Sequence, residues 1–198
     1  MLPQNKPTLI LASSSPRRQE LLREIGIPFQ VHAANINEDQ IAGEDAREYA
    51  LRLAREKAQT VAARYPQSYV LGADTIVVVD GEVLGKPKDH ADAARMLRIL
   101  SGRSHEVTTA VSLIAPDAVA PGTRTETRTS TTKVYFRSLT EDEIQQYVAS
   151  GEPMDKAGAY AIQGGAARWT DRIEGEWSNV VGLPLSLVTD LLRANGLK

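Results

Sequence analysis

The chain has 198 residues, with 23 basic and 25 acidic side chains, a formal net charge of −2 and 42% apolar residues. This length and composition fit one domain with a proper core, and the balanced charge argues against a nucleic-acid partner. No apolar run approaches the roughly 18 residues of a membrane span, and residues 1–8 lack a signal-peptide core. We therefore expect a cytoplasmic protein without a membrane partner. Cysteine is absent and the three histidines are widely spaced, so any metal would depend on carboxylates, which favours Mg²⁺ or Mn²⁺ over zinc.

Local signals place the elements of the first half of the chain. Ser15 and Pro16 are typical of the N-cap and first residue of a helix, and Gly26 is typical of a helix end. The pair Asp80-Gly81 predicts a hairpin turn. The patterns together predict a strand at 9–12, a helix from 16 to Gly26, a helix from 45 to about 64, an apolar strand at 69–79 interrupted by Asp74-Thr75, and a return strand at 83–84.

The second half mixes helices and strands without strict alternation. Thr140 and Glu143 form a capping-box pattern that opens a helix, and alternating threonines predict a long strand that reaches Phe136. The predicted elements are a helix at 89–100, a strand at 105–115, a loop at 116–122, the Thr-rich strand, a helix from 140 to about 149, a hairpin made of 168–173 and 177–181, and a closing helix at 184–194. This order predicts an α/β fold with a mixed sheet.

Polar residues at the first predicted strand–helix junction could bind phosphate. Ser13, Arg17 and Arg18 surround a helix start, where unpaired N–H groups and partial positive charge attract anions. The alternative is an ordinary N-cap with two solvated arginines. The loops that bind phosphate in P-loop and Rossmann proteins are absent from the sequence, so those folds are excluded.

Other candidate residues are single charges in unusual settings. Asp74 interrupts an apolar strand, where a carboxylate is costly unless it is paired or binds a metal. Lys57 follows the apolar stripe of its helix and could either reach solvent or enter a cleft. The remaining candidates are Lys86, which precedes a proline, Gln163, in a glycine-rich segment, and the acidic pair Glu38 and Asp39, each of which could instead be an ordinary solvated residue.

Six segments, taken together, resemble the Maf family of nucleotide pyrophosphatases. They occur in the family's order, span nearly the whole chain and are together highly specific. They are LASSSPRRQELL (11–22), LAREKA (53–58), LGADT (71–75), GEVLGKP (81–87), DKAGAYAIQG (155–164) and VVGLPL (180–185). One departure, RWT at 168–170, lies outside these motifs.

The resemblance implies a fold, a reaction and residue roles. The fold would be elongated and similar to the inosine-triphosphatase group: one Maf-like domain over residues 1–198, with a central cleft between two lobes. The reaction would hydrolyse a nucleoside triphosphate substrate between its α and β phosphates, with a divalent metal cation as cofactor. The implied catalytic base is Asp74, the implied metal ligands are Glu38 and Asp74, and the implied substrate-binding residues are Ser13, Arg17, Arg18, Lys57 and Lys86.

Three positions separate the family's subtypes. The combination of Arg17, Thr75 and Gln163 resembles the dTTP/UTP subtype, in which Thr75 and Gln163 would read the base. The alternatives are the same reaction on 7-methyl-GTP or another non-standard nucleotide, and a nucleotide-binding regulator of septum formation. The physiological role would be house-cleaning of the nucleotide pool, including modified pyrimidine nucleotides. The sequence leaves open whether the chain acts alone or as a homodimer.

Overall fold

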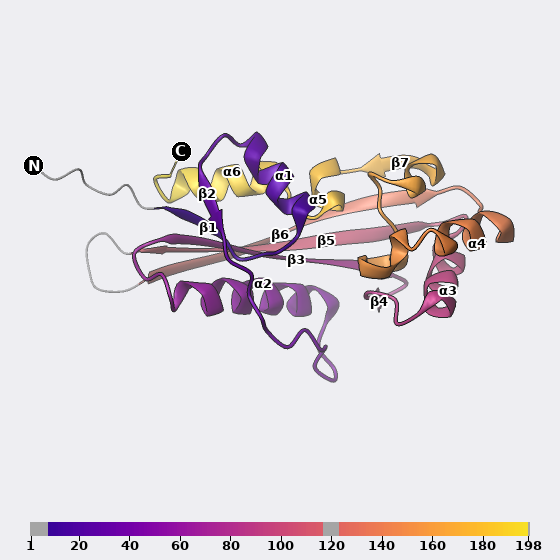
Figure 1. The fold of residues 1–198 in the computed structure, drawn as a ribbon, viewed down its shortest axis with the longest axis horizontal. Coiled ribbons are helices and arrows are strands. Elements are labelled where there is room, and N and C mark those ends of the chain that lie inside the picture. Colours follow the sequence, from indigo (N-terminus) through magenta and orange to yellow (C-terminus); the bar gives the residue numbers. More distant parts are fainter. Residues whose placement is uncertain (1–7, 117–122, 198) are drawn as a thin grey trace, which may run out of the picture. The chain divides into compact units, whose positions relative to one another are not determined.

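A computed structural model describes residues 8–116 and 123–197, so the loop expected at 116–122 lies almost wholly outside the described residues. The chain divides into two compact units. Unit 1 contains the described residues up to Asp74, those from Ala110 to Thr129 and those from Leu185 onward; unit 2 contains Thr75–Thr109 and Ser130–Pro184. Figure 1 shows the course of the chain through both.

The strands form one mixed sheet in the order β2-β1-β3-β5-β6-β7, with β4 paired to β3. Strand β1 is parallel to β2 and β3, whereas β4 is antiparallel to β3 and β7 antiparallel to β6. The strands are β1 (Leu9–Leu11), β2 (Phe29–Val31), β3 (Tyr69–Val79), β4 (Glu82–Leu84), β5 (Ser104–Pro116), β6 (Thr123–Phe136) and β7 (Thr170–Glu174). The predicted mixed α/β fold is confirmed, while the division into lobes with a cleft stays a prediction.

Six α-helices accompany the sheet in the described ranges. They are α1 (Pro16–Glu24), α2 (Ala46–Ala62), α3 (His90–Leu100), α4 (Glu141–Ala149), α5 (Trp177–Val181) and α6 (Leu185–Ala194). Three short 3₁₀ helices follow α4, namely η1 (Glu152–Asp155), η2 (Ala157–Ala159) and η3 (Gly165–Trp169). Over the described residues, no helix has both the length and the apolar character that a membrane crossing requires.

Sequence signals at helix ends are confirmed by the caps. The Ser15 side chain accepts the Arg18 N–H at the start of α1, and Pro16 is its first residue. Asp45 caps α2, and Thr140 and Glu143 form the capping box of α4. Each cap pairs backbone N–H groups that the first helical turn leaves without partners.

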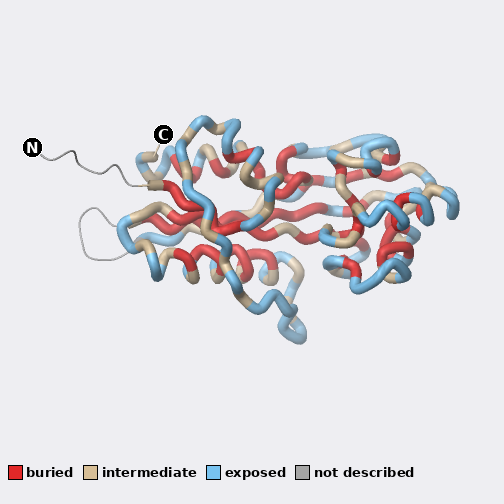
Figure 2. Tube along the Cα trace, in the orientation of Figure 1, coloured by how far each residue is buried: buried red, intermediate tan, exposed pale blue. Residues whose placement is uncertain are grey.

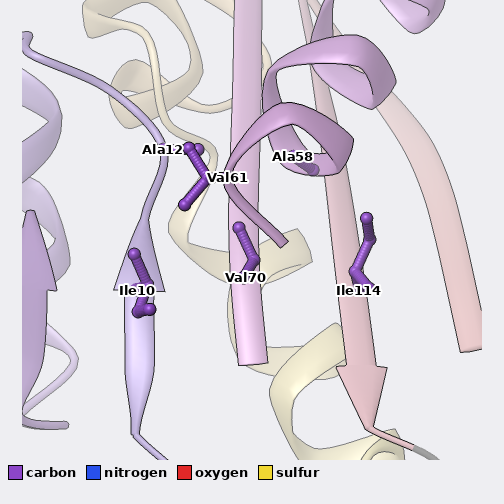
Figure 3. Close-up of a cluster of buried hydrophobic side chains, with 6 residues drawn as sticks. All are labelled: Ile10, Ala12, Ala58, Val61, Val70 and Ile114. Carbon is purple, nitrogen blue, oxygen red and sulfur yellow. The ribbon is translucent and has the colours of Figure 1, made fainter. Parts of the chain in front are cut away.

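The core of unit 1 lies between the sheet and its helices. In this unit α2 covers one face of the sheet, and α1 and α6 lie on the other (Figure 1). Figure 2 shows buried residues along β1 and β3. On the α2 side, Ala58 and Val61 pack against side chains from β1, β3 and β5 (Figure 3); the cluster is Ile10, Ala12, Ala58, Val61, Val70 and Ile114.

One prediction about local structure is wrong. Residues 177–181 form the helix α5 rather than the second strand of a hairpin, and the Trp177 side chain is 45% exposed. A segment of five residues is too short for periodicity to distinguish a strand from a helix. Here the buried Asn179 donates to the Val107 carbonyl and to Thr132 Oγ1, which anchors the helix. The predicted strand at 69–79 is confirmed, because β3 includes Asp74 and Thr75 within its apolar run.

Candidate active site

The centre of the candidate site in unit 1 is a lysine between two carboxylates. Lys57 Nζ lies 2.7 Å from Asp74 Oδ1 and 2.7 Å from Glu38 Oε1. Lys57 and Asp74 are each only 7% exposed, whereas 44% of the Glu38 side chain is accessible. A buried charge needs a partner, and the pairing of Lys57 with Asp74 explains how a carboxylate is tolerated within an apolar strand.

The close approach of α2 to β3 produces this pairing. A Cβ atom at Gly72 would lie 2.4 Å from the Ala54 carbonyl oxygen and 2.7 Å from the Ala58 backbone nitrogen, so only glycine fits there. Side chains alternate along a strand, which places Asp74 on the same face of β3 as Gly72. Lys57 precedes Ala58 on the helix and therefore reaches the Asp74 carboxylate directly.

The segment that carries Glu38 has no regular secondary structure and is held by α2. Tyr49 Oη donates to the Glu38 carbonyl at 2.6 Å, and Arg52 Nη2 donates to the Asp39 carbonyl at 3.0 Å. Burial is the largest cause of a raised pKa at Tyr49, and Asp74 and Glu38 raise it further. Tyr49 therefore stays a hydrogen-bond donor and fixes the backbone beside Glu38. Of the acidic pair, Glu38 joins the cluster while Asp39 contributes a backbone contact.

The serine and arginine motif surrounds the start of α1, as predicted. Ser13 is buried, and its Oγ accepts from the Ser15 backbone N–H at 3.2 Å and from Arg18 Nη1 at 3.4 Å. The same turn therefore gathers hydroxyls, a guanidinium and the start of a helix, where the helix dipole is positive. Such groups bind phosphate through charge-assisted hydrogen bonds.

Arg18 responds electrostatically to the carboxylate cluster. Burial lowers the pKa of its guanidinium, Asp74 and Glu38 raise it, and the neighbouring Arg17 lowers it. These interactions place the charges of Arg18, Asp74 and Glu38 in one region of unit 1. Of the predicted residues in this unit, Glu38, Lys57 and Asp74 are joined by ion pairs, Ser13 and Arg18 by a hydrogen bond, and Arg17 precedes Arg18 in α1.

Thr75 faces the other side of β3 from Asp74. Its Oγ1 lies 3.0 Å from Thr109 Oγ1, which donates to the Asn179 carbonyl at 2.9 Å. Because the single hydroxyl proton of Thr109 goes to Asn179, Thr75 is the donor in their contact, and its hydroxyl also lies 3.5 Å from the Gly182 carbonyl oxygen. The hydroxyl proton of Thr75 is thus donated within unit 2. This favours a role in supporting the site over direct contact of Thr75 with a nucleotide base.

The other two predicted residues of unit 2 are exposed. Lys86 lies between Gly85 and Pro87 after β4, and the Gly85 carbonyl accepts the Gly158 N–H at 3.1 Å. This bond ties the loop of Lys86 to the segment that leads to Gln163. No hydrogen bond joins the Gln163 side-chain amide to another residue in the described part of the chain.

Glu38 and Asp74 supply a donor set that fits a magnesium-type ion. Both carboxylates contact one ammonium nitrogen, so their oxygens converge on one point. Mg²⁺ in nucleotide sites is held by one or two carboxylates, with phosphates and waters as the other ligands. Within the ranges 8–116 and 123–197, no three His, Asp or Glu side chains are arranged as a metal site.

Sequence reasoning missed two groups of residues. One is Tyr49 with Arg52, which hold the Glu38 segment. The other is Tyr147 with Glu152, which bind the backbone on either side of Gln163. Tyr49 carried a signal, since it lies two turns before Lys57 on the same helix stripe. Tyr147 and Glu152 carried none, because their partners are backbone groups in a turn.

Comparison with known proteins gives one family over almost the whole chain. The family described as Maf-like protein matches residues 8–195. A protein of Koribacter versatilis named dTTP/UTP pyrophosphatase is 53% identical over 96% of this chain and 95% of its own length. Proteins of the same name from Geotalea uraniireducens and Geobacter metallireducens are each 51% identical, over 98% of this chain and 97% and 99% of their own lengths.

Proposed function

The chain belongs to the Maf family, and we propose that it hydrolyses dTTP and UTP between the α and β phosphates to the nucleoside monophosphate and pyrophosphate. The observation that carries this proposal is the cluster of Lys57 with Asp74 and Glu38 beside the basic start of α1. The names of the relatives supply the substrates. The role we propose is house-cleaning of the cytoplasmic nucleotide pool.

Positive groups of the site would bind the triphosphate. We assign this task to Arg17, Arg18, Lys57 and Lys86, with Ser13 and the N–H groups at the start of α1. Fixed donors and cations stabilise the charge that develops on phosphate oxygens during transfer, and they are effective because the protein holds them in place beforehand.

Asp74 is the proposed general base. Its carboxylate accepts a proton from the water that attacks the α phosphorus, and pyrophosphate leaves as the new P–O bond forms. Lys57 holds Asp74 Oδ1 at 2.7 Å, which fixes the direction of the second carboxylate oxygen. A carboxylate is a weak base for water, so the reaction needs help in activating the nucleophile.

A divalent cation would provide that help. Asp74 and Glu38 would hold Mg²⁺ or Mn²⁺, and the ion would lower the pKa of bound water and neutralise phosphate charge. Lys57 Nζ contacts the same carboxylates, so its ammonium and the cation compete for these oxygens. The chain would use Lys57 to keep both carboxylates in place and to contact a phosphate once the cation binds.

Gln163 is the residue that we assign to the base. Its amide both donates and accepts, so it can pair with a pyrimidine carbonyl and its adjacent N3–H group. Thr75 would support specificity from the opposite face of β3 through Thr109 and the α5 carbonyl of Asn179.

The test is pyrophosphate release from dTTP, UTP, CTP and 7-methyl-GTP, each with Mg²⁺ or Mn²⁺ and after chelation. We expect rapid release from dTTP and UTP that requires the cation. Release from 7-methyl-GTP alone would keep the reaction and overturn the substrate assignment. Binding of nucleotides without release would overturn the reaction and indicate a regulatory protein.

A further inference from the structure

Gln163 lies in a tight turn between η2 and η3. The Gly164 N–H donates to the Ala161 carbonyl at 3.0 Å, which closes the turn, and the Gln163 side chain is exposed. A glutamine on a short surface turn has many accessible orientations, and fixing it costs conformational entropy. Selective recognition of a base therefore requires that the turn itself be held.

Two side chains hold the turn at both ends. Tyr147 Oη accepts the Ala161 N–H at 3.0 Å and donates to Glu152 Oε1 at 2.8 Å. The Glu152 carboxylate accepts the Gly165 N–H, at 3.1 Å through Oε1 and at 3.3 Å through Oε2. The backbone on each side of Gln163 is thus bound to one phenol–carboxylate pair, which we call the Tyr147–Glu152 clamp.

The clamp is packed closely against the turn. A Cβ atom at Gly164 would lie 2.0 Å from Glu152 Oε1, and one at Gly165 would lie 3.0 Å from the Tyr147 ring. The Tyr147 ring is buried and meets the fully buried Trp169 edge to face, with centroids 4.8 Å apart. The two glycines therefore let the carboxylate and ring approach the backbone, and Trp169 fixes the ring.

We infer that Tyr147 and Glu152 are positioning residues that set base selectivity by fixing Gln163. This inference rests on the proposed function, in which Gln163 contacts the pyrimidine. An amide that reads a donor and an acceptor on one base edge must be placed accurately, and an error of about 1 Å can cost up to about a hundredfold in rate. The clamp binds the backbone N–H groups on each side of Gln163, so we expect it to act on base selectivity and not on proton transfer at Asp74.

The test measures kcat and KM for UTP and CTP in Tyr147→Phe and Glu152→Ala. We expect kcat/KM for UTP to fall about tenfold, mostly through KM, while kcat at saturating UTP changes by less than about threefold. The preference for UTP over CTP should fall by a similar factor. Glu141→Gln, which alters an exposed carboxylate at the other end of α4, is the matched control and should keep the wild-type preference.

Gly164→Ala is a further variant that disturbs the clamp in a different way. Its added methyl group displaces the Glu152 carboxylate, whereas Glu152→Ala removes that carboxylate. It should lower the preference for UTP, and in the Glu152→Ala background it should have little further effect, since neighbouring changes couple. An unchanged preference for UTP over CTP in folded Tyr147→Phe, Glu152→Ala and Gly164→Ala overturns the inference. Absence of turnover in the wild type and in Glu141→Gln would instead overturn the proposed function.

Discussion

Lys57 is the central residue of the buried charge cluster. Its ammonium lies 2.7 Å from carboxylate oxygens of both Asp74 and Glu38, and it is almost fully buried. Buried ion pairs contribute little net stability because desolvation offsets their attraction, whereas loss of one partner costs about 3–5 kcal/mol. The cluster therefore adds little net stability to the fold, which agrees with the role in binding phosphate and a cation that we propose for its charges.

The buried His105 should make the stability of the protein depend on pH. Its Nε2 lies 2.8 Å from Tyr160 Oη, and its Nδ1 has no hydrogen-bond partner among the residues described. Burial lowers the pKa of His105 from 6.5 to about 4. As the pH falls, His105 therefore binds a proton in the unfolded chain before it does so in the folded chain. The contribution of His105 to stability is complete above pH 6.5 and is lost as the pH falls toward 4.

The free energy of unfolding should fall by about 2 kcal/mol between pH 7 and pH 5 as a result. Urea denaturation at the two pH values measures this change. The variant His105→Gln should lose most of the pH dependence, and His90→Gln, at an exposed position, should keep it. A wild-type stability that is equal at both pH values would contradict the account of His105.

At the scale of elements, the contact between α2 and β3 depends on one glycine. In Gly72→Ala, the new methyl group would lie 2.4 Å from the Ala54 carbonyl oxygen, a backbone atom that cannot rotate away. We expect α2 to move outward, with a loss of about 2–3 kcal/mol in the free energy of unfolding. Pyrophosphate release should also fall, because Lys57 would be withdrawn from Asp74.

Thermal and urea unfolding of Gly72→Ala test this expectation. Gly85→Ala is the matched control for stability, since a Cβ atom there would meet nothing within 4 Å. Equal stabilities for the two variants would show that α2 does not depend on the absence of a side chain at position 72.

Elements with strong local signals could be predicted from the sequence. The caps of α1, α2 and α4 and the turn at Asp80-Gly81 all follow from short patterns, and the structure has each of them. Helix α5 could not be predicted, because its five residues carry no periodicity and its anchor is the contact of Asn179 with distant strands. Short sequence patterns predict hydrogen bonds between residues that are close in the chain, but not those between distant residues.

At the scale of the whole molecule, the candidate site could also be predicted only in part. The candidate residues could be named from their motifs, but the pairing of residues 38, 57 and 74 depends on the packing of α2 against β3. The partners of Thr75 and the clamp around Gln163 likewise join positions that are far apart in the chain or lie in irregular turns. Motifs identify which residues act, and the fold determines which of them act together.

The most direct test of the account compares pyrophosphate release from UTP by the wild type and by Asp74→Asn. Asparagine keeps the size of the side chain and removes its ability to accept the proton of water. We predict that kcat falls by about 10²–10⁴-fold while the variant stays folded and still binds UTP. A folded Asp74→Asn protein that releases pyrophosphate at the wild-type rate would contradict the assignment of Asp74 as the base.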